Sequence, residues 1–195
     1  MGRIVVSEFI TLDGVMEDPG GAEGTPGGGW AFKFQRGPAG DKYKLDELFA
    51  ADALLLGRTT YQGFAQAWPN IKDEQGFAER MNGVKHYVVS NTLRDAEATW
   101  NNSQVIRGDV VAELTKLRAE PGGDLLVAGS RSLVQTLVAN GLVDEYRLMV
   151  YPLILGGGKR LFGDHGVPTG LALQDVAPAD DGVVMLTYRP IPATQ

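Results

Sequence analysis

Three short apolar runs, each followed by small polar residues, constrain the fold of this 195-residue chain more than any other feature. The runs are DALLLGRTTY (52–61), KHYVVSNTL (85–93) and GDLLVAGSRSL (123–133). Their apolar residues are consecutive and do not alternate with polar ones, which is typical of strands buried on both faces of a parallel sheet. The runs therefore predict a mostly parallel sheet whose strands end in polar turns.

Segments with helical spacing alternate with these runs, because their apolar residues recur every three or four positions. These segments are 41–52, 109–120 and 130–141. The last one closes with Asn140 and Gly141, a combination that often caps the C-terminus of a helix. Alternating strands and helices predict an α/β protein.

The two ends of the sequence extend this sheet. RIVVSEFI (3–10) predicts a first strand, and VDEYRLMVYPLIL (143–155) and DGVVMLTYRP (181–190) predict long strands without a full helix between them. Strands joined in this way favour an antiparallel edge added to the parallel sheet. The glycine-rich segment 17–30 predicts a long loop, either a mobile lid or a disordered insertion. No domain boundary is evident, so we expect a single domain over 1–195.

Composition narrows the partners and the location. With 44% hydrophobic and 22% charged residues the chain can bury a sizeable core. A net charge of −6 disfavours nucleic acid and anionic lipid as partners. The sequence lacks both an apolar run of membrane-spanning length and a secretory signal, so we expect a cytoplasmic protein.

Composition also narrows the chemistry. The sequence has no cysteine, which excludes disulfides, thiolate nucleophiles and cysteine metal sites. Its two histidines, His86 and His165, lack metal-like spacing, so no metal site is expected, and we interpret each as structural or solvated. A hydrolase built on a nucleophile–histidine–acid triad therefore has little support.

Two strand-to-helix turns of matching type remain as candidate ligand sites. Each has a glycine at the end of a strand, hydroxyl residues that could cap the next helix, and an arginine beside them. The residues are Gly57, Arg58, Thr59 and Thr60 in the first turn, and Gly129, Ser130, Arg131 and Ser132 in the second. Helix N-termini and arginines both favour phosphate, so two such turns at one sheet edge fit a dinucleotide. Plain helix capping with surface arginines is the alternative interpretation.

Five motifs in order resemble those of one enzyme family. They are ITLDG (10–14), LLLGRTTY (54–61), HYVVSNT (86–92), LLVAGSRSLVQTL (125–137) and VDEYRLMVYPLILGGGKRLF (143–162). Together they resemble the reductases related to dihydrofolate reductase and to the reductase domain of the bifunctional riboflavin-pathway deaminase–reductase. The resemblance covers roughly residues 3–189. It implies a dihydrofolate-reductase-like three-layer α/β sandwich, with a mostly parallel central sheet and an antiparallel C-terminal edge, and NADPH as the cofactor.

The resemblance also implies which residues bind NADPH. The first turn, with Arg58, is expected on the 2′-phosphate side, and Ser90 and Asn91 near the adenosine ribose phosphate. The second turn is expected near the pyrophosphate, although this chain has Ala128, Gly129 and Ser130 where dihydrofolate reductases usually have three glycines with a cis bond. Asp13 and Gly14 match the point where the chain enters the active-site loop over the nicotinamide.

The catalytic and substrate-binding residues each have two interpretations. Asp41 matches the helical acid of the family and could help to protonate the substrate nitrogen, or it could be a helix N-cap. Asp13 could instead be an ordinary turn residue. Trp30, in an active-site loop insertion expected over 17–40, could form a stacking wall for a flat heterocycle or anchor the loop in the core. Lys159 or its neighbour Arg160 could contact an anionic substrate group or a dimer partner.

The expected function is NADPH-dependent reduction of a small nitrogen heterocycle or a ribosylamino-pyrimidine. A non-catalytic nucleotide-binding protein of the same fold is the alternative, because the catalytic carboxylate is uncertain, and a small-molecule hydrolase is a third class. The long apolar strand at 143–155 predicts pairing with a second copy, and the resemblance also implies a homodimer.

Overall fold

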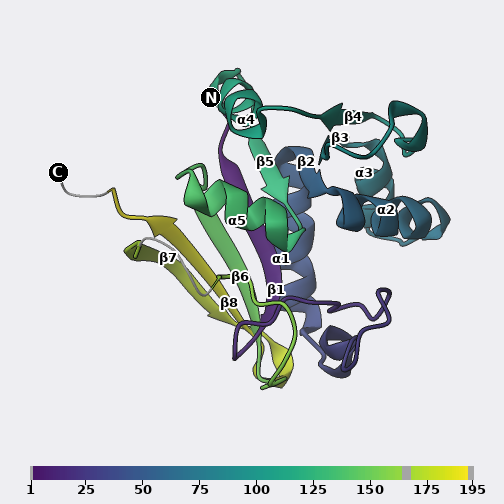
Figure 1. Ribbon diagram of the computed structural model, residues 1–195. Coiled ribbons are helices and arrows are strands. Elements are labelled where there is room, and N and C mark those ends of the chain that lie inside the picture. The colour runs from purple at the N-terminus through teal and green to yellow at the C-terminus, as the bar shows by residue number, and fades with distance from the viewer. Residues whose placement is uncertain (1, 164–167, 193–195) are drawn as a thin grey trace.

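An eight-stranded sheet lies at the centre of the computed structural model, which describes residues 2–163 and 168–192. The strand order is β4-β3-β2-β5-β1-β6-β8-β7 (Figure 1). The strands are β1 (Ile4–Thr11), β2 (Ala51–Gly57), β3 (Lys85–Val89), β4 (Ser103–Ile106), β5 (Asp124–Val127), β6 (Glu145–Tyr151), β7 (Leu171–Pro178) and β8 (Val184–Pro190). Neighbours from β4 to β6 are parallel, whereas β8 pairs antiparallel with both β6 and β7. The mostly parallel sheet with an antiparallel C-terminal edge is therefore confirmed.

Helices cover both faces of this sheet and complete three layers (Figure 1). They are α1 (Gly37–Ala50), α2 (Arg58–Ala67) and α3 (Phe77–Gly83) on one face, and α4 (Val110–Ala119) and α5 (Arg131–Ala139) on the other. Alternate residues of β2 enter the two cores: Leu54 packs in the cluster that holds Leu48 of α1, and Leu55 in the cluster that holds Leu114 of α4. Because both faces are covered, the strands read as continuous apolar runs.

Some element boundaries differ from those that the sequence predicts. The helix expected at 41–52 begins at Gly37, with Pro38 in its first turn, a position where the missing N–H of proline costs nothing. It ends at Ala50, because the next residues belong to β2. The short strand β4 and the edge strand β7 were not predicted. Most residues of β7 are exposed, so its sequence lacks the apolar run of a central strand.

The late strand β6 lies inside the sheet, between β1 and β8. The prediction of a homodimer through 143–155 assumed that this apolar strand is exposed and has too little cover, whereas β6 is paired on both sides and five of its seven residues are buried. The reason given for the interface is therefore wrong. A homodimer remains a proposal.

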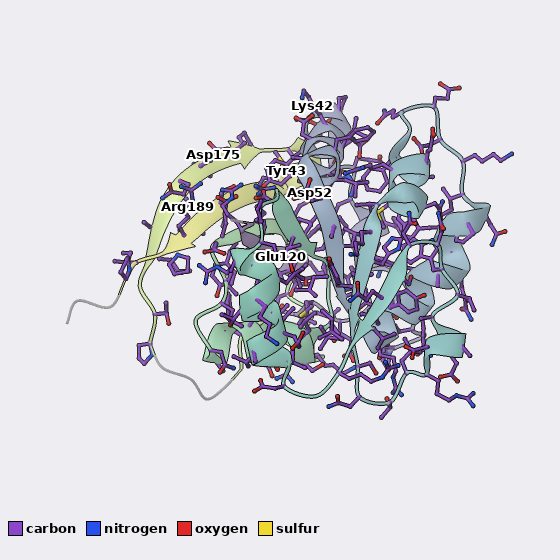
Figure 2. The ribbon with its side chains drawn as sticks, turned by 90° about the horizontal axis from the view of Figure 1, so that it is seen from above. Lys42, Tyr43, Asp52, Glu120, Asp175 and Arg189 are labelled. Carbon is purple, nitrogen blue, oxygen red and sulfur yellow. The ribbon has the colours of Figure 1, made fainter. Side chains whose placement is uncertain are left out.

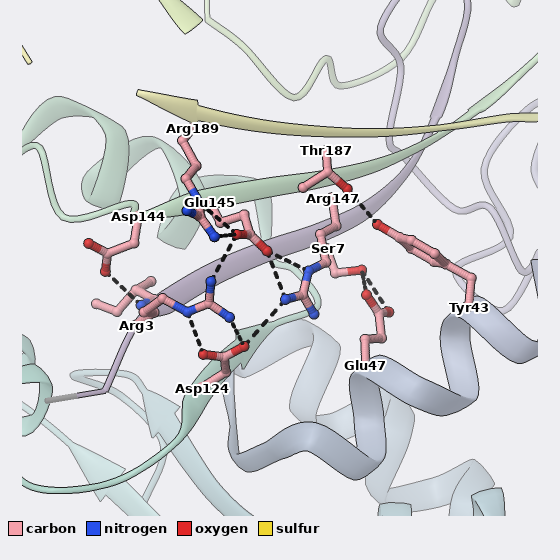
Figure 3. Close-up of polar contacts among 11 residues, drawn as sticks. Arg3, Ser7, Tyr43, Glu47, Asp124, Asp144, Glu145, Arg147, Thr187 and Arg189 are labelled. Atoms are coloured by element: carbon pink, nitrogen blue, oxygen red, sulfur yellow. Dashed lines mark hydrogen bonds and ion pairs between the residues drawn. The ribbon is translucent and has the colours of Figure 1, made fainter. Parts of the chain in front are cut away.

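Ion pairs fasten the amino ends of the central strands (Figure 3). Arg3 donates to Asp124 from Nε (2.8 Å) and to Glu145 from Nη1 (2.9 Å). Arg147 and Arg189 also pair with Glu145. Arg189 lies on β8 (Figure 2). This cluster lies at the end of the sheet opposite to the candidate site described next. Because the two carboxylates are buried, removing one of their partners would leave an uncompensated buried charge.

Candidate functional site

A cavity of about 290 Å³ lies at the carboxyl edge of the sheet, where β2, β3 and β5 end. Its polar lining residues are Arg58, Thr59, Thr92, Ser130, Ser132 and Thr136. The other four lining residues are a glycine and three aliphatic side chains, so none of the described lining residues is acidic. Hydroxyl groups, a guanidinium and two helix N-termini therefore face the same space, which suits an anionic ligand.

The first turn leads from β2 into α2. Gly57 is the N-cap of α2 and provides no side-chain cap, and Thr59 and Thr60 lie inside the first turn. The prediction that one of these threonines caps the helix is therefore wrong. The N–H groups of the first turn have no side-chain cap in the described structure and can bind a ligand instead. Arg58 is held over the cavity by a hydrogen bond from Nη1 to Thr92 Oγ1 (2.9 Å).

The second turn leads from β5 into α5 and touches the first. Gly57 N donates to Gly129 O (3.2 Å). A Cβ atom on Gly57 would lie 2.1 Å from Ser130 Oγ, which could rotate away, but also 2.9 Å from Ser130 Cβ, so a side chain at this position would push the two turns apart. Gly129 has a φ of +84°, and its Cβ would meet Thr60 Oγ1 at 2.7 Å. The two predicted turns are thus one continuous surface.

Ser130 and Ser132 both face the cavity from this second turn. Ser130 occupies the N-cap position of α5 as predicted, but its side chain does not cap the helix. Its Oγ instead lies 3.0 Å from Ser132 Oγ. The peptide bond between Gly129 and Ser130 is cis, although a serine stands where the resembled family has a glycine.

Six of the predicted cofactor residues do not line the cavity, namely Gly14, Thr60, Ser90, Asn91, Gly129 and Arg131. Arg131 donates from Nε to Arg160 O (2.8 Å) and does not face the cavity. Ser90 Oγ accepts hydrogen bonds from the backbone of the following loop, and Asn91 Oδ1 accepts from Gly108 N (2.9 Å). These two residues shape the loop that presents Thr92, which was not among the predicted site residues. Its position directly after Asn91 at the end of a strand was the available signal.

Asp13 and Gly14 form a tight turn after β1. The Asp13 carboxylate accepts hydrogen bonds from Thr11 Oγ1 (2.6 Å), Leu155 N (3.1 Å) and Gly156 N (2.9 Å). These bonds, led by that of Thr11, lower the pKa of Asp13 to about 2. Gly14 has a φ of +81°. This geometry fits the interpretation of Asp13 as a turn residue, and an acid of such low pKa does not suit proton delivery.

Asp41 matches neither of its two interpretations. It lies in the second turn of α1, because the helix begins at Gly37 with Arg36 as its N-cap. Its side chain is about half exposed and accepts a hydrogen bond from Arg36 Nε (2.6 Å). A solvated, paired carboxylate is not an acid in an apolar pocket, so the expected environment is wrong.

Trp30 anchors the glycine-rich loop in a core, and its alternative role as a stacking wall is wrong. The side chain is fully buried, donates from Nε1 to Glu17 O (2.9 Å) and meets Tyr151 edge-on. Asp18 holds the loop, since its carboxylate accepts from the backbone N–H groups of Glu23 and Thr25. The loop therefore has a defined structure and is not a disordered insertion.

The charged residues of the GGGKRLF segment are paired with acids from the start of the chain. Lys159 is exposed and forms an ion pair with Glu17. Arg160 donates from Nε to the backbone oxygen of Asp13 (3.0 Å). These contacts join the segment to the loop after β1. Neither residue lines the cavity at the ends of β2, β3 and β5.

One buried acid beside the cavity was missed. Glu8 of β1 is 8% exposed, and its Oε1 accepts a hydrogen bond from Gly129 N (2.6 Å). Burial raises the pKa of Glu8 to about 8. The available signal was a glutamate inside the otherwise apolar run RIVVSEFI. Glu8 does not itself line the cavity, but its partner Gly129 directly precedes Ser130, which does. Because a shifted pKa at such a place often marks a functional group, Glu8 joins the candidate residues.

The histidine of β3 is structural, as predicted. His86 is buried, stacks on Trp100 at 3.7 Å, and its ring nitrogens lie 2.8 Å from Asn101 O and 2.9 Å from Met81 O. His165 lies outside the described residues. Within the described ranges no group of three His, Asp or Glu residues could hold a metal ion, and no helix there has the length and apolar character needed to cross a membrane.

Comparisons with known proteins agree with this geometry. YyaP of Bacillus subtilis (strain 168), an uncharacterized protein, is 30% identical over 96% of this chain and 94% of its own length. A crystal structure from Shewanella sp. PV-4, provisionally named as a riboflavin biosynthesis protein, has a TM-score of 0.77 at 19% identity and covers 97% of this chain and 99% of its own. Dihydrofolate reductase from Enterococcus faecalis has a TM-score of 0.54 at 13% identity, covering 96% of each chain. The fold is therefore dihydrofolate-reductase-like. The family model described as the RibD C-terminal domain matches residues 3–185, and the chain belongs to this family.

Proposed function

We propose that this protein is an NADPH-dependent reductase of a small nitrogen heterocycle or a ribosylamino-pyrimidine. One arrangement carries the proposal. The N-termini of α2 and α5 have no side-chain caps, and their turns contact each other through Gly57 and Gly129. Both turns border a cavity with no described acidic lining residue. Family membership supports a reductase, and the name of the Shewanella neighbour points to riboflavin biosynthesis.

The residues present fit the phosphate groups of NADPH. Arg58 and Thr59 offer a guanidinium, a hydroxyl and free N–H groups for the 2′-phosphate. Ser130 and Ser132 offer hydroxyls at the N-terminus of α5 for the pyrophosphate. When bound, NADPH supplies a hydride to the substrate. The protein binds and orients the reactants, because the turn at Gly57 and Gly129 fixes both donor sets on one rigid surface.

A non-catalytic nucleotide-binding protein is the second candidate. The exposure of Asp41 and its ion pair with Arg36 favour this candidate, since the acid that the family resemblance implied is not placed for proton delivery. Both candidates share the cofactor surface and differ in turnover. We also keep a cytoplasmic location and a homodimer as proposals, and light scattering at micromolar concentration tests the dimer.

One titration followed by an activity assay distinguishes the two candidate functions. We expect NADPH to bind with a change in its fluorescence and to raise the melting temperature, and NADH to bind more weakly. Addition of pterins, pyrimidines and ribosylamino-pyrimidines should then oxidise NADPH with at least one compound. Binding without oxidation across the panel would support the non-catalytic candidate. Absence of any NADPH effect on melting would contradict both.

A further inference from the structure

A buried carboxyl group stands directly behind the cofactor turn. Glu8 extends from β1 to the end of β5, where its Oε1 accepts the N–H of Gly129 (2.6 Å). Gly129 N is its one hydrogen-bond partner among the residues described, so Oε2 is unpaired there. Ser130, the next residue along the turn, lines the cavity. A buried acid with a free oxygen therefore lies one residue away from the ligand surface.

A compact polar cluster on α1 sets the charge around Glu8. Lys44 Nζ donates to Ser7 Oγ (2.9 Å), lies 5.0 Å from the centre of the Phe9 ring and forms an ion pair with Glu47. The Ser7 hydroxyl donates to the Glu47 carboxylate, with 2.8 and 2.9 Å to its two oxygens (Figure 3). Glu47 is thus held by a hydroxyl and an ammonium group, whereas Glu8 has neither.

Burial, the largest effect, and the charge of Glu47 both favour the protonated form of Glu8. The Gly129 N–H and the charge of Lys44 oppose it, and the balance raises the pKa of Glu8 to about 8. At neutral pH the side chain therefore holds a proton that it can release just above neutrality. This is the range in which a general acid works best.

We propose that Glu8 is the acid that protonates the substrate nitrogen during reduction, an inference that rests on the proposed function. The carbon of a substrate C=N bond accepts the hydride that NADPH supplies, and the π electron pair of that bond moves to nitrogen. The nitrogen takes the proton from Glu8. The products are the amine, NADP⁺ and the Glu8 carboxylate, which water reprotonates before the next turnover.

The competing explanation is that Glu8 only satisfies the N–H of Gly129. Glu8→Gln separates the two roles, because the amide oxygen of glutamine can accept the same hydrogen bond while its NH₂ group cannot act as an acid near neutral pH. The side chains also have nearly the same volume. Glu113→Gln, which changes an exposed carboxylate on α4, is the matched control.

The first test measures the proton directly and needs no substrate. In infrared difference spectra between wild type and Glu8→Gln, the protonated-carboxyl band of Glu8 should persist at pH 7 and disappear near pH 8. Wild-type stability relative to Glu8→Gln should also fall with rising pH between about 4.5, where the unfolded side chain ionises, and about 8. A band that is lost by pH 5 would overturn the proposal, because an ionised carboxylate has no proton to give.

The second test follows turnover with the substrate found in the panel above. Glu8→Gln should bind NADPH as wild type does and lose roughly a hundredfold or more in turnover, whereas Glu113→Gln should keep it. Wild-type turnover should decline above about pH 8. A Glu8→Gln variant as active as wild type would refute the role of Glu8 and leave the reductase intact. If wild type itself oxidises no NADPH, the proposed function fails, and the infrared titration still decides whether Glu8 carries the proton.

Discussion

Arg58 Nη1 donates a hydrogen bond to Thr92 Oγ1 at 2.9 Å and so joins the first turn of α2 to the loop after β3. The bond holds the guanidinium on the rim of the cavity before a ligand binds, which lowers the entropic cost of binding. The nitrogens Nε and Nη2 of the Arg58 guanidinium remain available as donors to a phosphate.

Replacing this arginine should change cofactor choice. Arg58→Ala should weaken NADPH binding by about ten- to a hundredfold, the scale of a charge-assisted hydrogen bond, and leave NADH binding almost unchanged. Fluorescence titration of both variants with both cofactors measures the ratio. Arg131→Ala is the matched comparison, because Arg131 points to Arg160 and should have little effect. An unchanged NADPH/NADH ratio in Arg58→Ala would exclude the role of Arg58.

Asp41 should tolerate substitution. Its half-exposed ion pair with Arg36 is worth less than about 1 kcal/mol, and Asp41→Asn keeps an acceptor for Arg36 Nε. We expect NADPH affinity, turnover and stability to stay close to wild type, as judged by steady-state kinetics and urea unfolding. A hundredfold loss of turnover with normal folding would restore Asp41 as the acid and contradict the assignment of that role to Glu8.

Asp13 should stabilise the fold in a pH-dependent way. Its lowered pKa, about 2, means that it adds stability above its ordinary value of 3.8 and that this stability is lost as the pH falls towards 2. Asp13→Asn should therefore cost on the order of 2 kcal/mol at pH 7 and about half of that at pH 3. Urea unfolding at both pH values measures this difference. Asp175→Asn, on the exposed strand β7 (Figure 2), is the matched surface control. An equal cost of Asp13→Asn at both pH values would contradict a stabilising role of the ionised Asp13 carboxylate.

The two charged residues of α1 should shift the titration of Glu8 in opposite directions. Lys44→Met removes the cation that favours ionisation and should raise the pKa of Glu8. Glu47→Gln removes the anion that opposes ionisation and should lower it. Each shift should be on the order of one pH unit, read from the infrared band of Glu8 and from the alkaline limb of turnover. Shifts in the same direction would show that changed packing, and not charge, controls Glu8.

The fold could be predicted from the sequence because strands that are buried on both faces consist of consecutive apolar residues. LLLG of β2 and LLVAG of β5 are continuous apolar runs that stop where the chain leaves the sheet, so their ends and their turns were identifiable. The same logic failed for β7. That strand lies at the edge, is mostly exposed and carries no comparable run.

The candidate site could be predicted only in part, because the direction of a side chain depends on tertiary contacts. Arg58 and Arg131 occupy equivalent places in matching turns, yet Arg58 bonds to Thr92 on the cavity rim and Arg131 to Arg160 away from it. Glu8 reaches Gly129 because β1 and β5 are paired with Val6 opposite Val127. That register joins segments more than a hundred positions apart, and local patterns do not contain it.

The central position of β1 determines when the protein can fold during its synthesis. Both sheet partners of β1 come late in the chain: Arg3 meets Asp124, 121 positions later, and β6 follows after that. A nascent chain therefore carries an unpaired, apolar β1 until β5 has left the ribosome, because such long-range contacts form only after the intervening chain is available. The pairing of β1 with β5 also brings Glu8 to Gly129, so the candidate site is assembled only after β5 has been synthesised.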